Sequence, residues 1–298
     1  MNFLSLKVRG IRSKGKAGWV KGLKSSHGVD FLAVQESKIM DPSVWLLPKC
    51  WGNSTFLFDC VNSDGIAGGL ICWWDPSCFR QTGVIKSHHV LVISGDMVHS
   101  GFHVNIANVH APNDAAGRRN FWNELLFYRR SLFGLRIFLG DFNLVRSIDE
   151  RVNSDFLAQN ALSFNSFIAD ADLFEYNMCG HKYTYMSSNG EKLSKLDRSL
   201  VCNDFMSNWP SAELTTLSRH LSDHCPLLLS IKNSDYGHIP FRFYDSWLQL
   251  PGFVDFVNSI ANNFVFDGPA DIALAADGQF VGQPLSGIND IKITHLIG

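Results

Sequence analysis

The sequence predicts an α/β protein in which two β-sheets pack against each other and helices cover their outer faces. Short apolar, β-branched and aromatic runs recur through the first 232 residues, and many are bounded by Gly, Asn, Asp or Pro, which is typical of strands. Helical segments fall between these runs without the strict strand–helix alternation of a parallel sheet. Many strands with irregularly placed helices favour two packed sheets.

The predicted elements are strands and helices with the following limits. The strands cover residues 2–8, 30–36, 55–61, 69–74, 89–94, 102–110, 136–143, 182–186, 196–202 and 225–231, and the helices cover residues 14–26, 115–132 and 155–169. The segment 115–132 has the clearest helical pattern, because apolar residues recur there at helical spacing: Phe121, Leu125, Tyr128 and Leu132. Gly134 ends this helix just before the strand that leads to Asp141.

The composition sets limits on size and partners. With 298 residues, of which 46% are hydrophobic, the chain can bury one large core or one core with a short appendage. Charged residues make up 18% and the net charge is −2, so the chain lacks the basic excess that nucleic-acid binders often show. Any contact with DNA must therefore come from a local patch. The composition neither supports nor excludes a nucleic-acid substrate.

The cysteines and the apolar runs indicate an intracellular, soluble protein. The 7 cysteines are scattered and form no Cys-x-x-Cys pair, so we expect reduced core residues and neither disulfides nor a zinc site. The N-terminus shows no signal peptide, and no run approaches the roughly 18 apolar residues of a membrane span.

The character of the sequence changes after residue 232. We expect one folded domain over residues 1–232, followed by a linker and a short segment over residues 233–265. Residues 266–298 are rich in Gly, Ala and Asp with little periodicity, which predicts a disordered tail.

Polar side chains gather at the ends of three predicted strands. Glu36 follows the apolar run 31–34, Asp141 and Asn143 follow the run 136–139, and Asp223-His224 precedes the strand 225–231. Sheets commonly place active sites at strand ends. Carboxylates and an imidazole at these positions suggest metal-assisted cleavage of a phosphate ester.

Such a reaction needs charge neutralisation on the phosphoryl oxygens, a nucleophilic water and a stabilised leaving oxygen. Mg²⁺ prefers oxygen ligands and needs only one or two carboxylates from the protein, for which Glu36 and Asp223 are the candidates. Asp141 could orient or deprotonate the water. Asn143 lies two residues further on the same face of an extended chain and could donate a hydrogen bond to the phosphate.

His224 could transfer a proton or bind the phosphate, provided that a carboxylate holds its ring, and Asp197 is the hypothesis for that carboxylate. Each residue also has an ordinary structural interpretation. An Asp-x-Asn sequence after Gly is usually a turn or a helix cap, and an Asp-His pair is often a surface pair. The order of these elements, each at the edge of a strand, favours the phosphoesterase.

Five short motifs occur in a fixed order: Val34-Gln35-Glu36-Ser37-Lys38, Asn108-Val109-His110-Ala111-Pro112-Asn113, Gly140-Asp141-Phe142-Asn143, Lys195-Leu196-Asp197-Arg198 and Ser222-Asp223-His224-Cys225-Pro226-Leu227. This set resembles the motifs of the endonuclease/exonuclease/phosphatase family, which includes deoxyribonuclease I, over about residues 1–232. Within that family the chain looks most similar to the endonuclease domain of plant non-LTR (LINE-type) retrotransposons. That similarity rests on Tyr183-Thr184-Tyr185 and on the segment 241–248.

The resemblance implies a four-layer α/β/β/α sandwich of the deoxyribonuclease I-like kind and a Mg²⁺-dependent endonuclease, with Mn²⁺ as an alternative metal. It implies DNA as partner, cleavage of one strand to leave a 3′-hydroxyl, a nuclear location and no membrane. No protein partner is indicated, and we expect a monomer. The resemblance assigns metal binding to Glu36 and Asp223, and substrate binding to Arg9, Asn113 and Asn143. It assigns catalysis to His110, Asp141, Asn143, Asp197 and His224.

Two positions depart from the family pattern. The segment 4–10 resembles the first motif, Trp-Asn-x-Arg-Gly, but Lys7 stands where the family has the Asn whose oxygen faces the metal. Lys7 could pair with Glu36 and take the place of the metal, or its long stem could carry the charge to solvent or to DNA phosphate. An imidazole at His110 replaces the hydroxyl of the usual Tyr and can also donate a hydrogen bond to phosphate.

Two other functions stay open. A truncated, inactive retrotransposon remnant is favoured by Lys7, by the lack of a following polymerase and by the unfamiliar tail. A phosphomonoesterase is less favoured, because no basic loop for a polyphosphate head group stands out. Basic residues that could contact phosphate, or simply form a solvated helix face, are Arg118, Arg119, Arg129, Arg130 and Lys182.

Overall fold

The computed structural model describes residues 1–41, 46–52, 55–65, 68–231, 251–253 and 255. The chain divides into two compact units, Met1–Asn233 and Ser234–Gly298. The predicted linker and tail, residues 233–298, lie outside the described residues except for 251–253 and 255.

The first sheet has seven strands in the order β11–β15–β16–β1–β2–β4–β3 among the described residues. In chain order these are β1 (Asn2–Lys7), β2 (Phe31–Gln35), β3 (Leu57–Val61), β4 (Leu70–Trp74), β11 (Met178–Gly180), β15 (Glu213–Thr216) and β16 (Leu227–Ser230). β1 lies at the centre, parallel to β2 and antiparallel to β16. The last residue of β1, Lys7, is paired with Gln35, the residue before Glu36.

The second sheet has six strands in the order β10–β14–β8–β7–β6–β5 over the same described part of the chain. They are β5 (Phe79–Lys86), β6 (Val90–Met97), β7 (His103–His110), β8 (Leu135–Asp141), β10 (Leu173–Glu175) and β14 (Asp197–Cys202). β7 and β8 are parallel and place His110 beside Asp141, while β14 is antiparallel to β8 and places Asp197 beside Asp141. A small third sheet consists of β9 (Arg151–Val152), β12 (Tyr185–Met186) and β13 (Leu193–Ser194).

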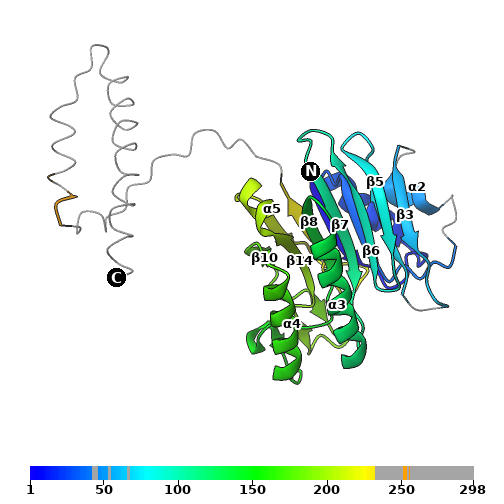
Figure 1. The fold of residues 1–298 in the computed structure, drawn as a ribbon. Coiled ribbons are helices and arrows are strands. Elements are labelled where there is room, and N and C mark those ends of the chain that lie inside the picture. The colour runs from blue at the N-terminus through cyan, green and yellow to red at the C-terminus, as the bar shows by residue number, and fades with distance from the viewer. Residues whose placement is uncertain (42–45, 53–54, 66–67, 232–250, 254, 256–298) are drawn as a thin grey trace, which may run out of the picture. The chain divides into compact units, whose positions relative to one another are not determined.

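Helices cover the outer face of each large sheet. Side chains of α1 (Lys16–Ser26) and α2 (Leu46–Trp51) pack on the first sheet, and those of α3 (Ala115–Ser131) and α4 (Ala158–Asp170) pack on the second. Figure 1 shows α3 and α4 next to each other over the strands β8 and β14. The short helix α5 (Asn203–Asn208) and the 3₁₀ helix η1 (Ile148–Glu150) complete the described elements. The predicted four-layer α/β/β/α sandwich is confirmed.

Apolar side chains from both sheets fill the space between them, including Phe3, Phe31, Ile93, Ile106 and Ile137. Each large sheet also buries a second apolar layer beneath its helices. The inner strands are therefore buried on both faces and need apolar residues at almost every position. This explains why the inner strands appear in the sequence as nearly continuous apolar runs.

One polar bridge crosses the space between the sheets. Asn108 on β7 donates from Nδ2 to the carbonyl oxygens of Val34 and Ile71, each at 3.1 Å, and accepts a hydrogen bond from Gln35 Nε2 at 2.7 Å. Asn108 and Gln35 are fully buried, and both the oxygen and the nitrogen of the Asn108 amide are hydrogen-bonded there. The bridge therefore fixes the ends of β2 and β7 relative to each other, just before Glu36 and His110.

Each predicted strand and helix has a counterpart, but several elements were not predicted. The two larger unpredicted strands are β5 and β15, and the unpredicted helices among the described residues are α2, α5 and the 3₁₀ helix η1. The predicted strand 136–143 ends at Asp141, and the predicted strand 182–186 is reduced to Tyr185–Met186. In the part of the chain that is described, no helix is long and apolar enough to cross a membrane.

The 7 cysteines all lie among the described residues and none forms a disulfide. Cys50, Cys72, Cys202 and Cys225 are buried, whereas Cys179 is exposed. Burial raises the pKa of Cys50 to about 12, so this thiol stays protonated.

Candidate active site

The predicted site residues meet where strands of both sheets end. Lys7 ends β1, and Glu36 follows β2. His110 and Asp141 are paired at the ends of β7 and β8, and the start of β14 brings Asp197 beside Asp141. Residues more than 130 positions apart in the sequence therefore share one edge of the sandwich, as the contact between Lys7 and Asp141 demonstrates.

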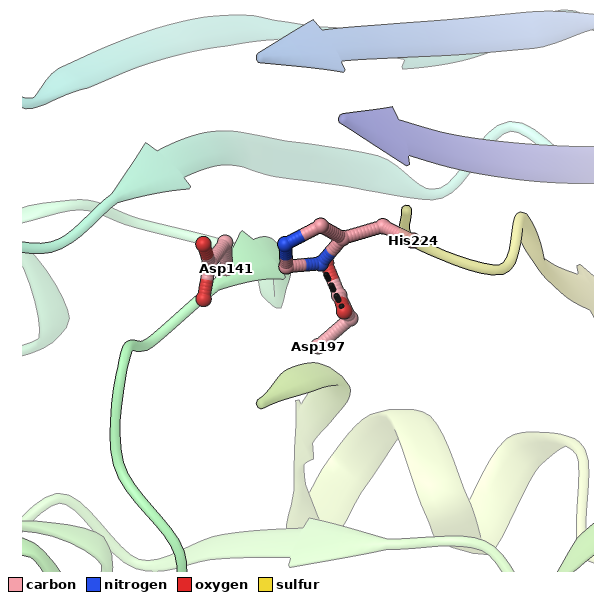
Figure 2. Close-up of side chains that lie close together, drawn as sticks. All are labelled: Asp141, Asp197 and His224. Carbon is pink, nitrogen blue, oxygen red and sulfur yellow. Dashed lines mark hydrogen bonds and ion pairs between the residues drawn. The ribbon is translucent and has the colours of Figure 1, made fainter. Parts of the chain in front are cut away.

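Asp197 and His224 form a buried pair, the histidine dyad. Nδ1 of His224 lies 2.7 Å from Oδ2 of Asp197. The imidazole ring lies between Asp197 and Asp141, with its second nitrogen directed toward Asp141 (Figure 2). The backbone of Asp197 is fixed by Thr184, whose Oγ1 accepts hydrogen bonds from the N–H groups of Leu196 and Asp197, each at 3.0 Å.

The environment of the dyad favours the imidazolium form. Burial alone would lower the pKa of His224, but the charge and hydrogen bond of Asp197, followed by the charge of Asp141, raise it above its ordinary value. Ligand atoms of Asp141, Asp197 and His224 lie within 4.8 Å of one another, which is close enough to surround a metal ion. Because Nδ1 of His224 is already engaged by Asp197, the ring and the two carboxylates are also suited to proton transfer.

Asp141 is fully buried and held on both oxygens. Oδ1 accepts a hydrogen bond from the backbone N–H of Asn143 at 2.8 Å, and Oδ2 accepts one from Lys7 Nζ at 2.7 Å. Gly140 has φ +140°, and a Cβ there would lie 2.0 Å from the Val109 carbonyl oxygen. Only glycine allows β8 to approach β7 this closely one residue before Asp141.

Asn143 adopts a left-handed conformation with φ +52°. Its Nδ2 donates to the carbonyl oxygen of Ala111 at 2.6 Å, so the side chain links the end of β8 to the segment after β7. One amide hydrogen of Asn143 is thus engaged within the protein, and the amide group can offer a substrate its other hydrogen.

Lys7, Glu36 and Asp141 form a second ionic group, the lysine clamp. Lys7 Nζ lies 2.7 Å from Asp141 Oδ2 and 2.9 Å from Glu36 Oε1, and only 9% of the Lys7 side chain is exposed. Nε2 of His110 lies 3.4 Å from the same oxygen of Glu36. Of the two alternatives for Lys7, the structure has the one in which the ammonium pairs with Glu36.

The charges of the lysine clamp stabilise one another. Burial alone would lower the pKa of Lys7, but the charges of Asp141 and Glu36 raise it well above its ordinary value. Burial would raise the pKa of Glu36, but the neighbouring His110 ring and the Lys7 charge hold it well below its ordinary value. Burial likewise opposes ionisation of Asp141, whose pKa is nevertheless lowered by Lys7 and then by His224. All three clamp residues are therefore ionised at neutral pH.

Asp223 has a partner of its own. Its Oδ2 lies 2.6 Å from Nη1 of Arg9, whose side chain is 56% exposed. The preceding residue, Ser222, donates from Oγ to the Lys7 carbonyl oxygen at 2.6 Å and so fixes this loop to the end of β1. Lys16 Nζ donates to the Arg9 carbonyl oxygen at 3.1 Å and to that of Val8. Arg9 thus lies at the rim of the site, beside Asp223.

The remaining predicted residues lie further out. Asn113 is exposed in the segment after β7, where its carbonyl oxygen accepts a hydrogen bond from buried Arg118. Arg129 donates to the Ala171 carbonyl oxygen at 2.8 Å, and Lys182 lies 3.2 Å from Asp149. Arg118 and Arg129 therefore stabilise the fold.

Sequence reasoning missed three supporting features: Thr184, the bridge between Asn108 and Gln35, and a buried network around Arg198. Arg198 Nη1 lies 2.9 Å from Glu175 Oε2, and its Nη2 contacts Glu150. The only available signal was that Thr184, Asn108, Gln35 and Arg198 fall inside the motifs quoted for the resemblance.

No family model matches this sequence. Solved structures do match its fold. An AP endonuclease of Leishmania major is 15% identical, with a TM-score of 0.63 over 76% of this chain and 86% of that one. The APE2 catalytic domain of Xenopus laevis is 14% identical, with a TM-score of 0.61 over 78% of this chain and 92% of that one.

A third match is the endonuclease domain of TRAS1, a telomere-specific non-LTR retrotransposon, at 12% identity and a TM-score of 0.56 over 78% of this chain and 99% of that domain. This chain has the endonuclease/exonuclease/phosphatase fold. The resemblance predicted from the motifs is confirmed at the level of the fold.

The resemblance implies a divalent metal ion, and the side chains of the site show whether such an ion fits there. Glu36 and Asp141 both point at the Lys7 ammonium, and Asp223 is paired with Arg9. A divalent ion about 4 Å from an ammonium would be repelled by about 8 kcal/mol at an effective dielectric constant near 20, twice the value for two unit charges. The residues present, as arranged, do not fit a divalent ion beside Glu36 and Asp141.

Proposed function

We propose that this chain is a phosphodiesterase domain that acts on DNA, as an endonuclease that cleaves one strand and leaves a 3′-hydroxyl. The observation that carries the proposal is the histidine dyad, with Nδ1 of His224 2.7 Å from Asp197 and the other ring nitrogen directed toward Asp141 (Figure 2). A buried acid–base pair beside a second buried carboxylate, at the strand ends of this fold, is suited to activating water against a phosphate.

The reaction requires a bond to form between water oxygen and phosphorus while the bond from phosphorus to the 3′-oxygen breaks. Asp141 orients the water and accepts its proton. The His224 imidazolium donates its proton to the departing 3′-oxygen, which leaves as the 3′-hydroxyl, and Asp197 holds the ring in place. His110 and Asn143 are further hydrogen-bond donors to phosphate, and half-exposed Arg9 binds a neighbouring phosphate.

Bound Mg²⁺ would supply charge neutralisation on the phosphoryl oxygens. Glu36 and Asp223 are the ligands that the sequence proposes, but Lys7 and Arg9 already neutralise these carboxylates. No step of the reaction is therefore assigned to the metal.

Several solved structures with this fold support DNA as the substrate. One neighbour is a Neisseria 3′ phosphatase bound to a product DNA hairpin, and another is the TRAS1 endonuclease domain. We extend the proposal to a retrotransposon origin, a monomeric domain and a nuclear location, where the DNA substrate is found.

Nicking of supercoiled plasmid tests the proposal. The wild-type protein is incubated with and without Mg²⁺, beside His224→Ala and beside His99→Ala as a matched control. His99 is an exposed histidine just after β6, at the other end of the sandwich. Loss of an acid–base group should lower the nicking rate about 10²–10⁴-fold, and His99→Ala should leave it unchanged. Equal nicking by wild type and His224→Ala would contradict the proposal.

A second candidate function is DNA binding without cleavage. It is favoured by the lysine clamp, in which one ammonium neutralises Glu36 and Asp141 together. A protein that retards DNA in a gel but yields no open-circular plasmid in Mg²⁺ would support this second function over the first.

A further inference from the structure

We propose that Lys7 is a built-in substitute for a divalent ion: its ammonium excludes Mg²⁺ and Mn²⁺ from Glu36 and Asp141, and replacing Lys7 by a neutral amide opens a metal site between them. This inference deepens the proposed function and rests on it for the role of the site. The binding of metal itself is independent of whether DNA is cleaved.

The first argument is geometric. One ammonium lies 2.7 Å from Asp141 Oδ2 and 2.9 Å from Glu36 Oε1, so the two carboxylates converge on a single cation. Two converging carboxylate oxygens are the protein contribution that Mg²⁺ commonly needs. The same point in space cannot hold the ammonium and a metal ion together.

The second argument is that Lys7 is held in place. It is the last residue of β1, paired with Gln35 of β2, and its carbonyl oxygen accepts a hydrogen bond from Ser222 Oγ at 2.6 Å. Its side chain is 9% exposed, between carboxylates that are 0% and 18% exposed. Swinging the ammonium into solvent would leave Asp141 buried without its nearest cation, which opposes displacement of Lys7 by a weakly held ion.

The third argument is the balance of charge. Two carboxylates and one ammonium carry a single net negative charge, and adding a divalent ion would reverse its sign inside a largely buried space. With a neutral side chain at position 7, the same two carboxylates balance a divalent ion completely. Asp223 does not alter this balance, because Arg9 lies 2.6 Å from it.

Direct titration of Mn²⁺, followed by electron paramagnetic resonance in the absence of DNA, tests the inference. The proteins are wild type, Lys7→Asn, the double variant Lys7→Asn/Glu36→Gln, and Lys182→Asn as a control for loss of a lysine. Lys182 is 54% exposed and is paired with exposed Asp149. Lys7→Gln serves as a second variant in which a neutral amide replaces Lys7; both are called opened variants. Circular dichroism verifies that each protein is folded.

Lys7→Asn or Lys7→Gln should bind one Mn²⁺ at least about tenfold more tightly than wild type, a difference of about 1.4 kcal/mol. Lys182→Asn should match wild type, and the Glu36→Gln double variant should lose the gain. The melting temperature of the opened variant should rise with Mn²⁺, whereas that of the wild type should not.

Equal Mn²⁺ affinity in wild type and a folded opened variant would overturn the inference, and so would a gain that survives Glu36→Gln. The same proteins are then assayed for plasmid nicking. If Lys7→Asn binds Mn²⁺ but neither it nor the wild type nicks, the inference stands and the proposed function fails.

Discussion

The lysine clamp and the histidine dyad lie at the same edge of the sandwich and share Asp141 as a neighbour, yet they leave different groups available for chemistry. In the dyad, His224 uses one ring nitrogen for Asp197 and directs the other toward Asp141 (Figure 2). In the clamp, Lys7 binds Glu36 and Asp141 together, so its ammonium occupies the point where these two carboxylates converge. Burial and ion pairing alone therefore do not mark a reactive group; a polar atom must also remain for the substrate.

The largest expected effect is a loss of folding stability when Lys7 of the lysine clamp is replaced. Lys7→Met leaves Glu36 and Asp141 without their shared cation, which should lower the free energy of unfolding by about 3–5 kcal/mol. Urea unfolding at neutral pH measures it. Lys182→Met, at an exposed ion pair, should change the same quantity by less than about 1 kcal/mol. Similar losses in the two variants would show that the clamp is not a buried ion pair.

The pH dependence of stability should differ in sign between the two groups. Glu36 and Asp141 have lowered pKa values, so their stabilisation is present above their ordinary values and is lost as the pH falls below about 4.5 and 3.8, respectively. His224 has a raised pKa, so its stabilisation is complete below about pH 6.5 and is lost as the pH rises through the value in the folded protein.

Urea unfolding between about pH 3 and 9 measures both limbs. Lys7→Met should flatten the acid limb, and His224→Gln should flatten the loss above about pH 6.5. If His224→Gln leaves that loss unchanged, some other group produces it.

A smaller effect is expected at the support of the dyad. Thr184→Val keeps the shape of the side chain but removes the oxygen that accepts two backbone hydrogen bonds, and the buried N–H groups left without a partner should cost about 1–3 kcal/mol. Thr184→Ser retains the hydroxyl and should restore most of this stability. Thermal unfolding compares the three proteins, and equal melting temperatures would show that the hydroxyl does not hold Asp197.

The smallest effect on stability is expected at the rim. Because the Arg9 side chain is 56% exposed, Arg9→Ala should change the free energy of unfolding by at most about 1 kcal/mol. If Arg9 binds phosphate, the slope of log affinity for DNA against log salt should decrease by about one unit. Fluorescence anisotropy over a range of salt concentrations measures this slope, and an unchanged slope would place Arg9 outside the DNA interface.

The sequence predicted the two sheets and the edge of the sandwich that carries the site. It could do so because strands buried on both faces have nearly continuous apolar sequences. The edge strand β5 was missed: after Phe79 its residues alternate between partly buried and exposed, and its pairing shifts between Gln81 and Gly83. The sequence also offered two directions for Lys7. Only the convergence of Glu36 and Asp141 from different sheets decides between them, and that convergence is a property of the tertiary structure.

The lysine clamp also has a genetic consequence. Lysine codons end in a purine and asparagine codons end in a pyrimidine after the same first two bases, so one transversion at codon 7 exchanges the two amino acids. If the ammonium of Lys7 alone closes the metal site, loss and recovery of that site are each a single mutation away. Selection on a lineage that carries this chain could therefore silence or restore the site without rebuilding any other part of the fold.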